Sequence, residues 1–315
     1  MRKLLLLTLL VSACFKNFGQ TKSFKNSPPV IADSLKQDEN SIESSDEKSS
    51  YFTLGLAMGN RLLSVQNKVV NSKETTEQVL IYTPSISYQN KTGFNIAAGT
   101  SFLNDSAKGF GINQYYLTTG YQLLGNDNID FSIAYTHYLI ADKYSVRSSP
   151  IQNDLFTSLV YKKSWLQPGI AFDFSSGNSY EVKRKNNLYD SITNHLKSYA
   201  LIASIAHEFS GKSVFAKDDE LSFTPSFLLN FGSGKINITH KTNAANIAQL
   251  VGKKGKLLKF ENTKFAAESV GFDFDIRYTI SKFTIEPDLY LDYYLPSTTT
   301  NRLSGVFNIS LGYTF

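Results

Sequence analysis

Charged side chains recur at two-residue spacing near the C-terminus of the 315-residue chain. Because successive side chains of a strand point to opposite faces, this spacing places them on one face of two strands. Apolar residues such as Phe272, Phe274 and Leu289 fill the other face. Arg61 and Asp173, on other segments, join the same polar cluster. Its remaining members are Asp273, Asp275, Arg277, Glu286, Asp288 and Asp292.

The cluster fits two roles. Carboxylates gathered between low-dielectric walls focus an electric field, which would give a cation-attracting or hydrogen-bonding passage for a small polar solute. Buried charges are also paired wherever they can be, so the same residues would make a salt-bridge network that plugs the interior. Arg61 and Arg277 are the candidate bridging cations in either case.

Catalytic and metal-binding patterns are scarce. Four histidines, at positions 137, 195, 207 and 240, are scattered without metal-ligand spacing, and no G-x-S-x-G or H-E-x-x-H motif occurs. We therefore predict a protein that is not an enzyme and has no metal or cofactor. The alternative is a membrane-embedded lipid hydrolase with His137 as base, because His137 faces outward by alternation and Ser148 and Ser149 follow in the next loop.

The elements that must position these residues are strands. Alternation of apolar with small or polar residues begins at Tyr51 and recurs to the C-terminus, the period-2 signal of a two-faced strand. We expect about twelve strands, at residues 51–62, 78–88, 93–103, 113–124, 129–140, 154–162, 165–176, 197–209, 220–231, 269–280, 283–295 and 303–315. Connections alternate between short (89–92, 125–128, 163–164, 281–282) and long (64–77, 141–153, 177–196, 232–268).

The N-terminus predicts export. Arg2 and Lys3 precede a short apolar run that fits a signal peptide of residues 1–19. Cleavage before Cys14, after a leader of residues 1–13, would instead make a lipoprotein with Cys14 lipidated; we favour ordinary cleavage slightly. Residues 20–50 read as a flexible acidic periplasmic linker.

Strand alternation also occurs in soluble barrels, whose apolar face points inward. The aromatic rings favour a membrane barrel over a soluble one, because they gather near the expected strand ends, where lipid headgroups meet the hydrocarbon. One predicted girdle contains Phe52, Tyr88, Tyr161, Trp165, Tyr278, Phe283 and Tyr313, and the other contains Tyr115, Tyr138 and Tyr293. No apolar run inside residues 51–315 approaches the roughly 18 residues of a membrane helix.

The last strand ends in an alternating pattern with a terminal aromatic residue. Its outward residues are Phe307, Ile309, Leu311, Tyr313 and Phe315. In this strand and in its leader the chain resembles the broad class of bacterial outer-membrane β-barrel proteins, over residues 51–315. The resemblance implies an all-β, antiparallel, up-and-down transmembrane barrel in the outer membrane, inserted by the outer-membrane assembly machinery, with membrane lipids as partners.

Loop composition completes the expectations. The expected extracellular loops are basic, which fits either a contact with lipopolysaccharide or an ordinary solvated surface; nucleic acid is not suggested. Residues 243–251 are expected to form a short helix in the longest loop. The basic residues are Lys183, Arg184, Lys185, Lys235, Lys241, Lys253, Lys254, Lys256, Lys259 and Lys264. We expect a narrow channel for small polar solutes, or a surface-exposed structural or binding protein.

Overall fold

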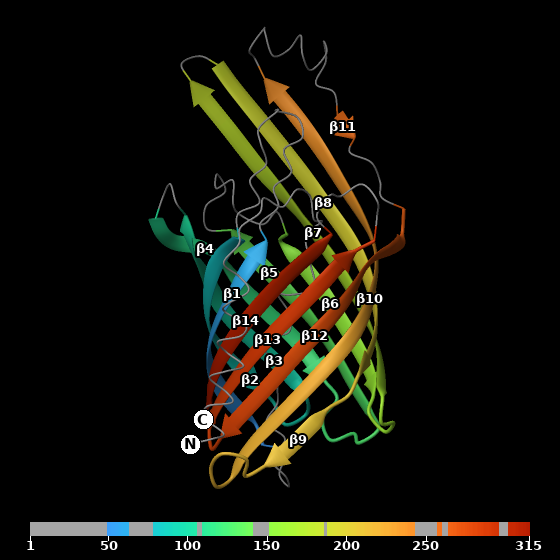
Figure 1. Ribbon diagram of the computed structural model, residues 1–315. Coiled ribbons are helices and arrows are strands. Elements are labelled where there is room, and N and C mark those ends of the chain that lie inside the picture. Colours follow the sequence, from blue (N-terminus) through green and yellow to red (C-terminus); the bar gives the residue numbers. More distant parts are fainter. Residues whose placement is uncertain are drawn as a thin grey trace.

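A computed structural model describes residues 49–62, 78–105, 109–140, 151–185, 188–242, 257–259, 264–295 and 302–315. These residues form one antiparallel sheet that closes into a barrel (Figure 1). Its strands are β1 (Tyr51–Leu62), β2 (Gln78–Gln89), β3 (Phe94–Asp105), β4 (Gly109–Gln122), β5 (Ile129–Ile140), β6 (Asn153–Tyr161), β7 (Gln167–Lys185), β8 (Leu188–Ala206), β9 (Phe209–Lys212), β10 (Asp219–Thr242), β11 (Leu257–Lys259), β12 (Ala266–Ile280), β13 (Phe283–Tyr294) and β14 (Leu303–Thr314).

Twelve of these strands make the wall. Each pairs with its neighbour in the chain, except that β10 bonds to both β8 and β12, and β1 closes the barrel against β14, with Thr53 opposite Thr314. β9 and β11 are short additions along β10. The predicted all-β, up-and-down barrel of about twelve strands is confirmed. Within the described ranges, no helix is long and apolar enough to cross a membrane.

The two faces of the wall have inverted polarity. Among the described residues, sixteen polar or charged side chains are buried, against nine apolar ones, and the large exposed apolar side chains lie at alternate positions along the strands. In β1, for example, Phe52, Leu54 and Leu56 are exposed, whereas Ala57 is buried. The interior is therefore polar and the outer surface apolar, the reverse of a soluble barrel.

Three strands project far beyond the rest of the barrel, at the end opposite the C-terminus (Figure 1). β7 and β8 pair as far as Lys185 and Leu188, and β10 follows β8 as far as Thr242. The predicted loops at 177–196 and 232–268 are thus wrong over much of their length, and His195 and His240 lie in strands. The pairing of β7 with β8 and of β8 with β10 continues the sheet beyond the strand bounds that the sequence predicted.

Other predictions for this end fall partly outside the described residues. The expected helix at 243–251 lies outside them, as do loop residues 63–77 and 141–150 and the basic residues at 253, 254 and 256. Lys183, Arg184, Lys185, Lys235, Lys241 and Lys259 lie on strands, and Lys264 is exposed. The lipopolysaccharide contact stays a prediction, as do the leader and linker in residues 1–48.

A tight turn joins β9 to β10 at the end that holds the C-terminus. The buried Asp219 carboxylate accepts hydrogen bonds from the backbone N–H groups of Val214, Phe215 and Ala216, at 2.6 to 2.9 Å, and from the Tyr278 hydroxyl. One carboxylate therefore satisfies three consecutive turn donors and ties the turn to β12.

Candidate functional site: the barrel lumen

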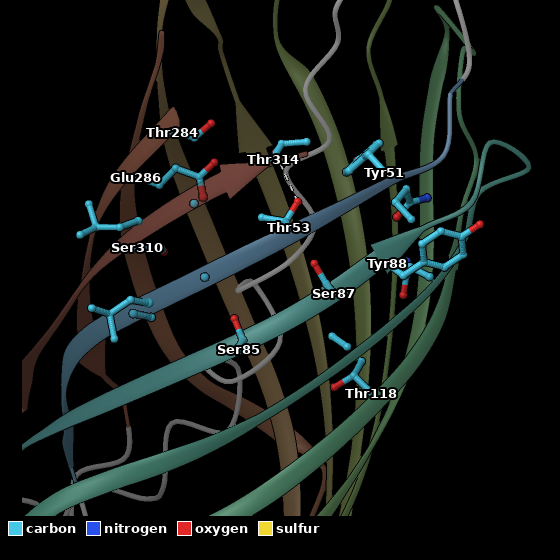
Figure 2. Close-up of a pocket in the computed structure, with 18 of the residues that line it drawn as sticks. Tyr51, Thr53, Ser85, Ser87, Tyr88, Thr118, Thr284, Glu286, Ser310 and Thr314 are labelled. Carbon is cyan, nitrogen blue, oxygen red and sulfur yellow. Dashed lines mark hydrogen bonds between the residues drawn. The ribbon is translucent and has the colours of Figure 1, made fainter. Parts of the chain in front are cut away.

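A cavity opens in the lumen near the end where β1 begins and β14 ends. Its walls come from β1, β2, β3, β4, β13 and β14, which are distant in sequence and meet because β1 pairs with β14. We call this cavity the vestibule (Figure 2). Its lining includes seven hydroxyl side chains, those of Thr53, Ser85, Ser87, Thr118, Thr284, Ser310 and Thr314.

Small residues keep the vestibule open. Gly55 lies beside Ser85, and a Cβ at Gly55 would come within 2.4 Å of the Ser85 hydroxyl oxygen. Lining hydroxyls pair with other hydroxyls, as in Thr53–Thr314 (3.3 Å) and Thr118–Thr136 (2.9 Å). Since a hydroxyl rotates to suit its partner, such pairs are readily exchanged for bonds to a solute.

Gln89 and Glu286 bring stronger polar groups to the vestibule. Gln89 is only 6% exposed, and its Nε2 atom makes no hydrogen bond within the described part of the chain. Glu286 also lines the vestibule, and its Oε1 lies 2.9 Å from Nε of Arg277. The sequence analysis placed Glu286 and Arg277 on the lumen side but missed Gln89, which alternation alone would have placed inward.

The predicted acidic wall lies on β12 and β13. Asp275 is the direct cross-strand partner of Asp288, and Asp273 and Asp292 are both buried. Carboxylates directly opposite each other destabilise an antiparallel pair unless a counter-charge or bound group offsets the repulsion. Arg277 supplies one such counter-charge, to Glu286.

Tyr290 organises the far part of this wall. Its hydroxyl donates to Asp292 at 2.9 Å and accepts from Nδ2 of Asn230 at 2.7 Å. Its ring lies over Gly271, where a Cβ would come within 2.6 Å of the ring. The glycine therefore lets the ring lie along the wall, which holds the Asp292 carboxylate in place.

A second acidic group lies on β6 and β7. Asp173 is buried, and the Ser175 hydroxyl lies 2.7 Å from Asp154 Oδ1 and 3.0 Å from Asp173 Oδ1. The one hydrogen of this hydroxyl can be donated to only one carboxylate at a time. Asp173 lies on β7, which pairs with neither β12 nor β13, so it does not belong to the β12–β13 wall. Sequence reasoning missed its partners Asp154 and Ser175.

Two β-bulges add polar side chains that regular alternation does not predict. In β4, Asn113 is skipped by the pairing with β3, so that Asn113 and Gln114 are both buried. In β12, Glu268 is skipped by the pairing with β10, and its carboxylate lies over Gly232 on that strand. Each bulge therefore turns one extra polar residue toward the interior.

Arg61 is the one member of the predicted cluster without a described side chain. Its backbone pairs with Val79, at the end of β1 farther from the vestibule. The structure thus gathers Asp273, Asp275, Arg277, Glu286, Asp288 and Asp292 on one wall, and Asp173 on another. The bridging role of Arg61 stays a prediction.

His137 lies on β5 away from the lumen. Its Nδ1 is 2.9 Å from Oδ1 of Asn153, which also accepts a hydrogen bond from the Tyr135 hydroxyl. Asn153 would orient a histidine base, but Leu139, the next outward residue of β5, and Leu117, the cross-strand partner, cannot act as nucleophiles. Ser148 and Ser149 lie outside the described residues.

The outer surface identifies the environment of the barrel. Near the vestibule end, exposed rings include Phe52, Tyr161, Trp165, Phe283 and Tyr313, and near the other end Tyr115 and Tyr293 are exposed. Leucine and isoleucine side chains such as Leu54, Ile86 and Ile170 are exposed between them. An apolar band with an aromatic rim at each end on a closed barrel matches a bilayer, since closure leaves no strand edge unpaired in lipid.

These features identify a transmembrane β-barrel of the outer-membrane type. The vestibule end holds the C-terminus and short turns, and is therefore the periplasmic end. One girdle residue was wrongly predicted, because Tyr138 is buried and its ring lies 6.4 Å from that of Tyr116, on the lumen side. Alternation with the exposed Tyr135 and Leu139 requires this inward orientation.

Comparison with known proteins adds little. No family model and no curated protein matches the chain. Similar solved structures include the NanC porin (8% identity, 82% of this chain and 98% of that one, TM-score 0.40). Others are the CymD monoaromatic hydrocarbon channel (10%, 84% and 88%, 0.33) and LpxR from Salmonella typhimurium (8%, 84% and 100%, 0.32). Scores this low carry no argument, so the assignment of the outer-membrane barrel rests on its own outer face.

Proposed function

We propose that the barrel is a narrow channel for small polar solutes that favours cations over anions. The observation that carries this proposal is the charge of the lumen. Arg277 is the one basic side chain that the described residues contribute to the lumen. The carboxylates that they contribute to it include Asp154, Asp173, Glu268, Asp273, Asp275, Glu286, Asp288 and Asp292.

The carboxylates act along the whole passage. Glu286 lines the vestibule near the periplasmic end. Asp292 lies six residues farther along the same strand, β13, toward the opposite end. Because the apolar band surrounds the lumen with low-dielectric material, the field of these groups is focused along the axis. A small cation would therefore be concentrated inside, and an anion excluded.

The plug hypothesis predicts a different measurement. If every carboxylate is held in a closed network, the purified barrel conducts no ions in a planar bilayer. If the channel proposal is correct, the barrel conducts ions, and the reversal potential of the current in a potassium chloride gradient shows a preference for potassium over chloride. The hydrolase alternative has one supporting contact, between His137 and Asn153. The described hydroxyl side chains next to Asn153 are Tyr135, which donates a hydrogen bond to it, and Ser176, its cross-strand partner on β7.

A further inference from the structure

The vestibule has the size of a small-solute site. Its volume is about 80 Å³. A site needs at least about 10–15 Å³ to hold one water, so the vestibule has room for several waters, and a small hydroxylated solute can take their place.

Gln89 gives the vestibule a fixed donor. The side chain is more than nine-tenths buried, lines the cavity, and leaves Nε2 without a hydrogen-bond partner in the described part of the chain. A buried amide donor without an acceptor costs free energy, so such a group calls for a bound molecule. Its neighbours across the strands are Tyr51 and Asn95, both of which also line the vestibule.

The chemistry of the lining favours a solute with hydroxyl groups over an anion. Every hydroxyl of the vestibule both donates and accepts, as do the hydroxyls of a sugar. Figure 2 shows Thr53, Ser85 and Ser87 on adjacent strands along one side of the cavity, with Thr284 and Ser310 on the strands beside them. Glu286, the carboxylate of the lining, is engaged by Arg277 and would repel an anion.

We propose that the vestibule binds a neutral, polyhydroxylated solute of monosaccharide size, with Gln89 Nε2 donating to a solute hydroxyl oxygen. The inference rests on the proposed function, whose solute class it names. Ordered water alone is the competing occupant, because water also accepts from a buried amide.

The test uses the full chain in planar bilayers, with glucose as the probe. Glucose should reduce the ion current with a saturable dependence on concentration. Gln89→Glu, which keeps the shape of the side chain and removes its donors, should weaken the apparent affinity for glucose by about ten-fold. The matched control is Gln122→Glu, since Gln122 is also a buried glutamine at the periplasmic end but does not line the vestibule.

Outcomes separate this inference from the channel proposal. Ion conduction with no effect of glucose overturns the inference alone and leaves water as the occupant. An equal loss in both variants also overturns it, because the effect is then not local to the vestibule. If no ion is conducted, titration calorimetry of the folded protein with glucose decides: binding that Gln89→Glu weakens upholds the site without a channel, and its absence overturns both.

Should Gln89→Glu fail to fold, as judged by identical gel migration with and without boiling, Ser85→Leu provides a second variant. The leucine would fill the vestibule beside Gly55. It should abolish the glucose effect and reduce the ion current. A glucose effect as strong as that of the unmodified protein would refute the placement of the site.

Discussion

Neutralising the acidic wall should lower the cation preference of the channel. The change is Asp273, Asp275, Asp288 and Asp292 to asparagine together, which keeps side-chain size and removes four charges. Twelve strands spaced about 4.8 Å apart and tilted by about 40° give a backbone radius of roughly 12 Å. Inward side chains then bring each carboxylate to within about 7 Å of the axis, by the same geometry.

That distance sets the magnitude. A unit charge at about 7 Å contributes about 0.6 kcal/mol in water, and screening at 0.1 M salt reduces this by roughly half. Four charges therefore stabilise a cation on the axis by about 1 kcal/mol, so that the variant should lose at least about five-fold in potassium over chloride permeability. The reversal potential in a potassium chloride gradient measures this ratio.

The control removes three exposed acidic charges in the turns at the end of the barrel: Asp127→Asn, Glu208→Gln and Asp218→Asn. It should leave the permeability ratio unchanged. The native preference should also shrink as salt is raised, because the Debye length falls. An unchanged ratio in the lumen variant, or an equal change in the control, would refute the reasoning.

Three further predictions concern assembly, chemistry and export. Deleting Phe315 removes a backbone hydrogen bond to the Phe52 carbonyl and an exposed terminal ring, so less protein should reach the heat-modifiable folded form on gels; undiminished insertion would contradict the assembly signal. His137→Ala should leave fatty-acid release from lipid at the background of the unmodified protein, whereas loss of a measurable activity would favour the hydrolase. Intact-mass spectrometry should find a mature chain beginning near Gln20, and a diacylglyceryl group on Cys14 would show the lipoprotein alternative instead.

The barrel strands could be predicted because the bilayer imposes a pattern on them. In β1 and β14 most outward positions are apolar and most inward ones small or polar, and the predicted bounds agree with the observed ones within a residue or two. Above the membrane this constraint ends. The outer parts of β7, β8 and β10 extend beyond the predicted strand ends, into residues that the sequence analysis assigned to loops.

The sequence predicted which side chains face the lumen, but not which of them lie next to one another there. Alternation placed Asp273 and Glu286 inward, but the bulge that turns Glu268 inward breaks the two-residue period and leaves no signal in the sequence. The vestibule depends on closure between β1 and β14, so its lining combines residues that are far apart in the sequence, such as Thr53 and Thr314. The pairing of Asp154 with Asp173 through Ser175 likewise needed the register of β6 and β7.

Single-channel recording of the purified full chain in planar bilayers tests the central claim most directly. The account predicts discrete current steps of low conductance with a reversal potential that favours potassium over chloride, because the described lumen carries an excess of carboxylates over Arg277. Insertion of heat-modifiable, folded barrels that produce no current steps would contradict it and would show that the polar network closes the lumen.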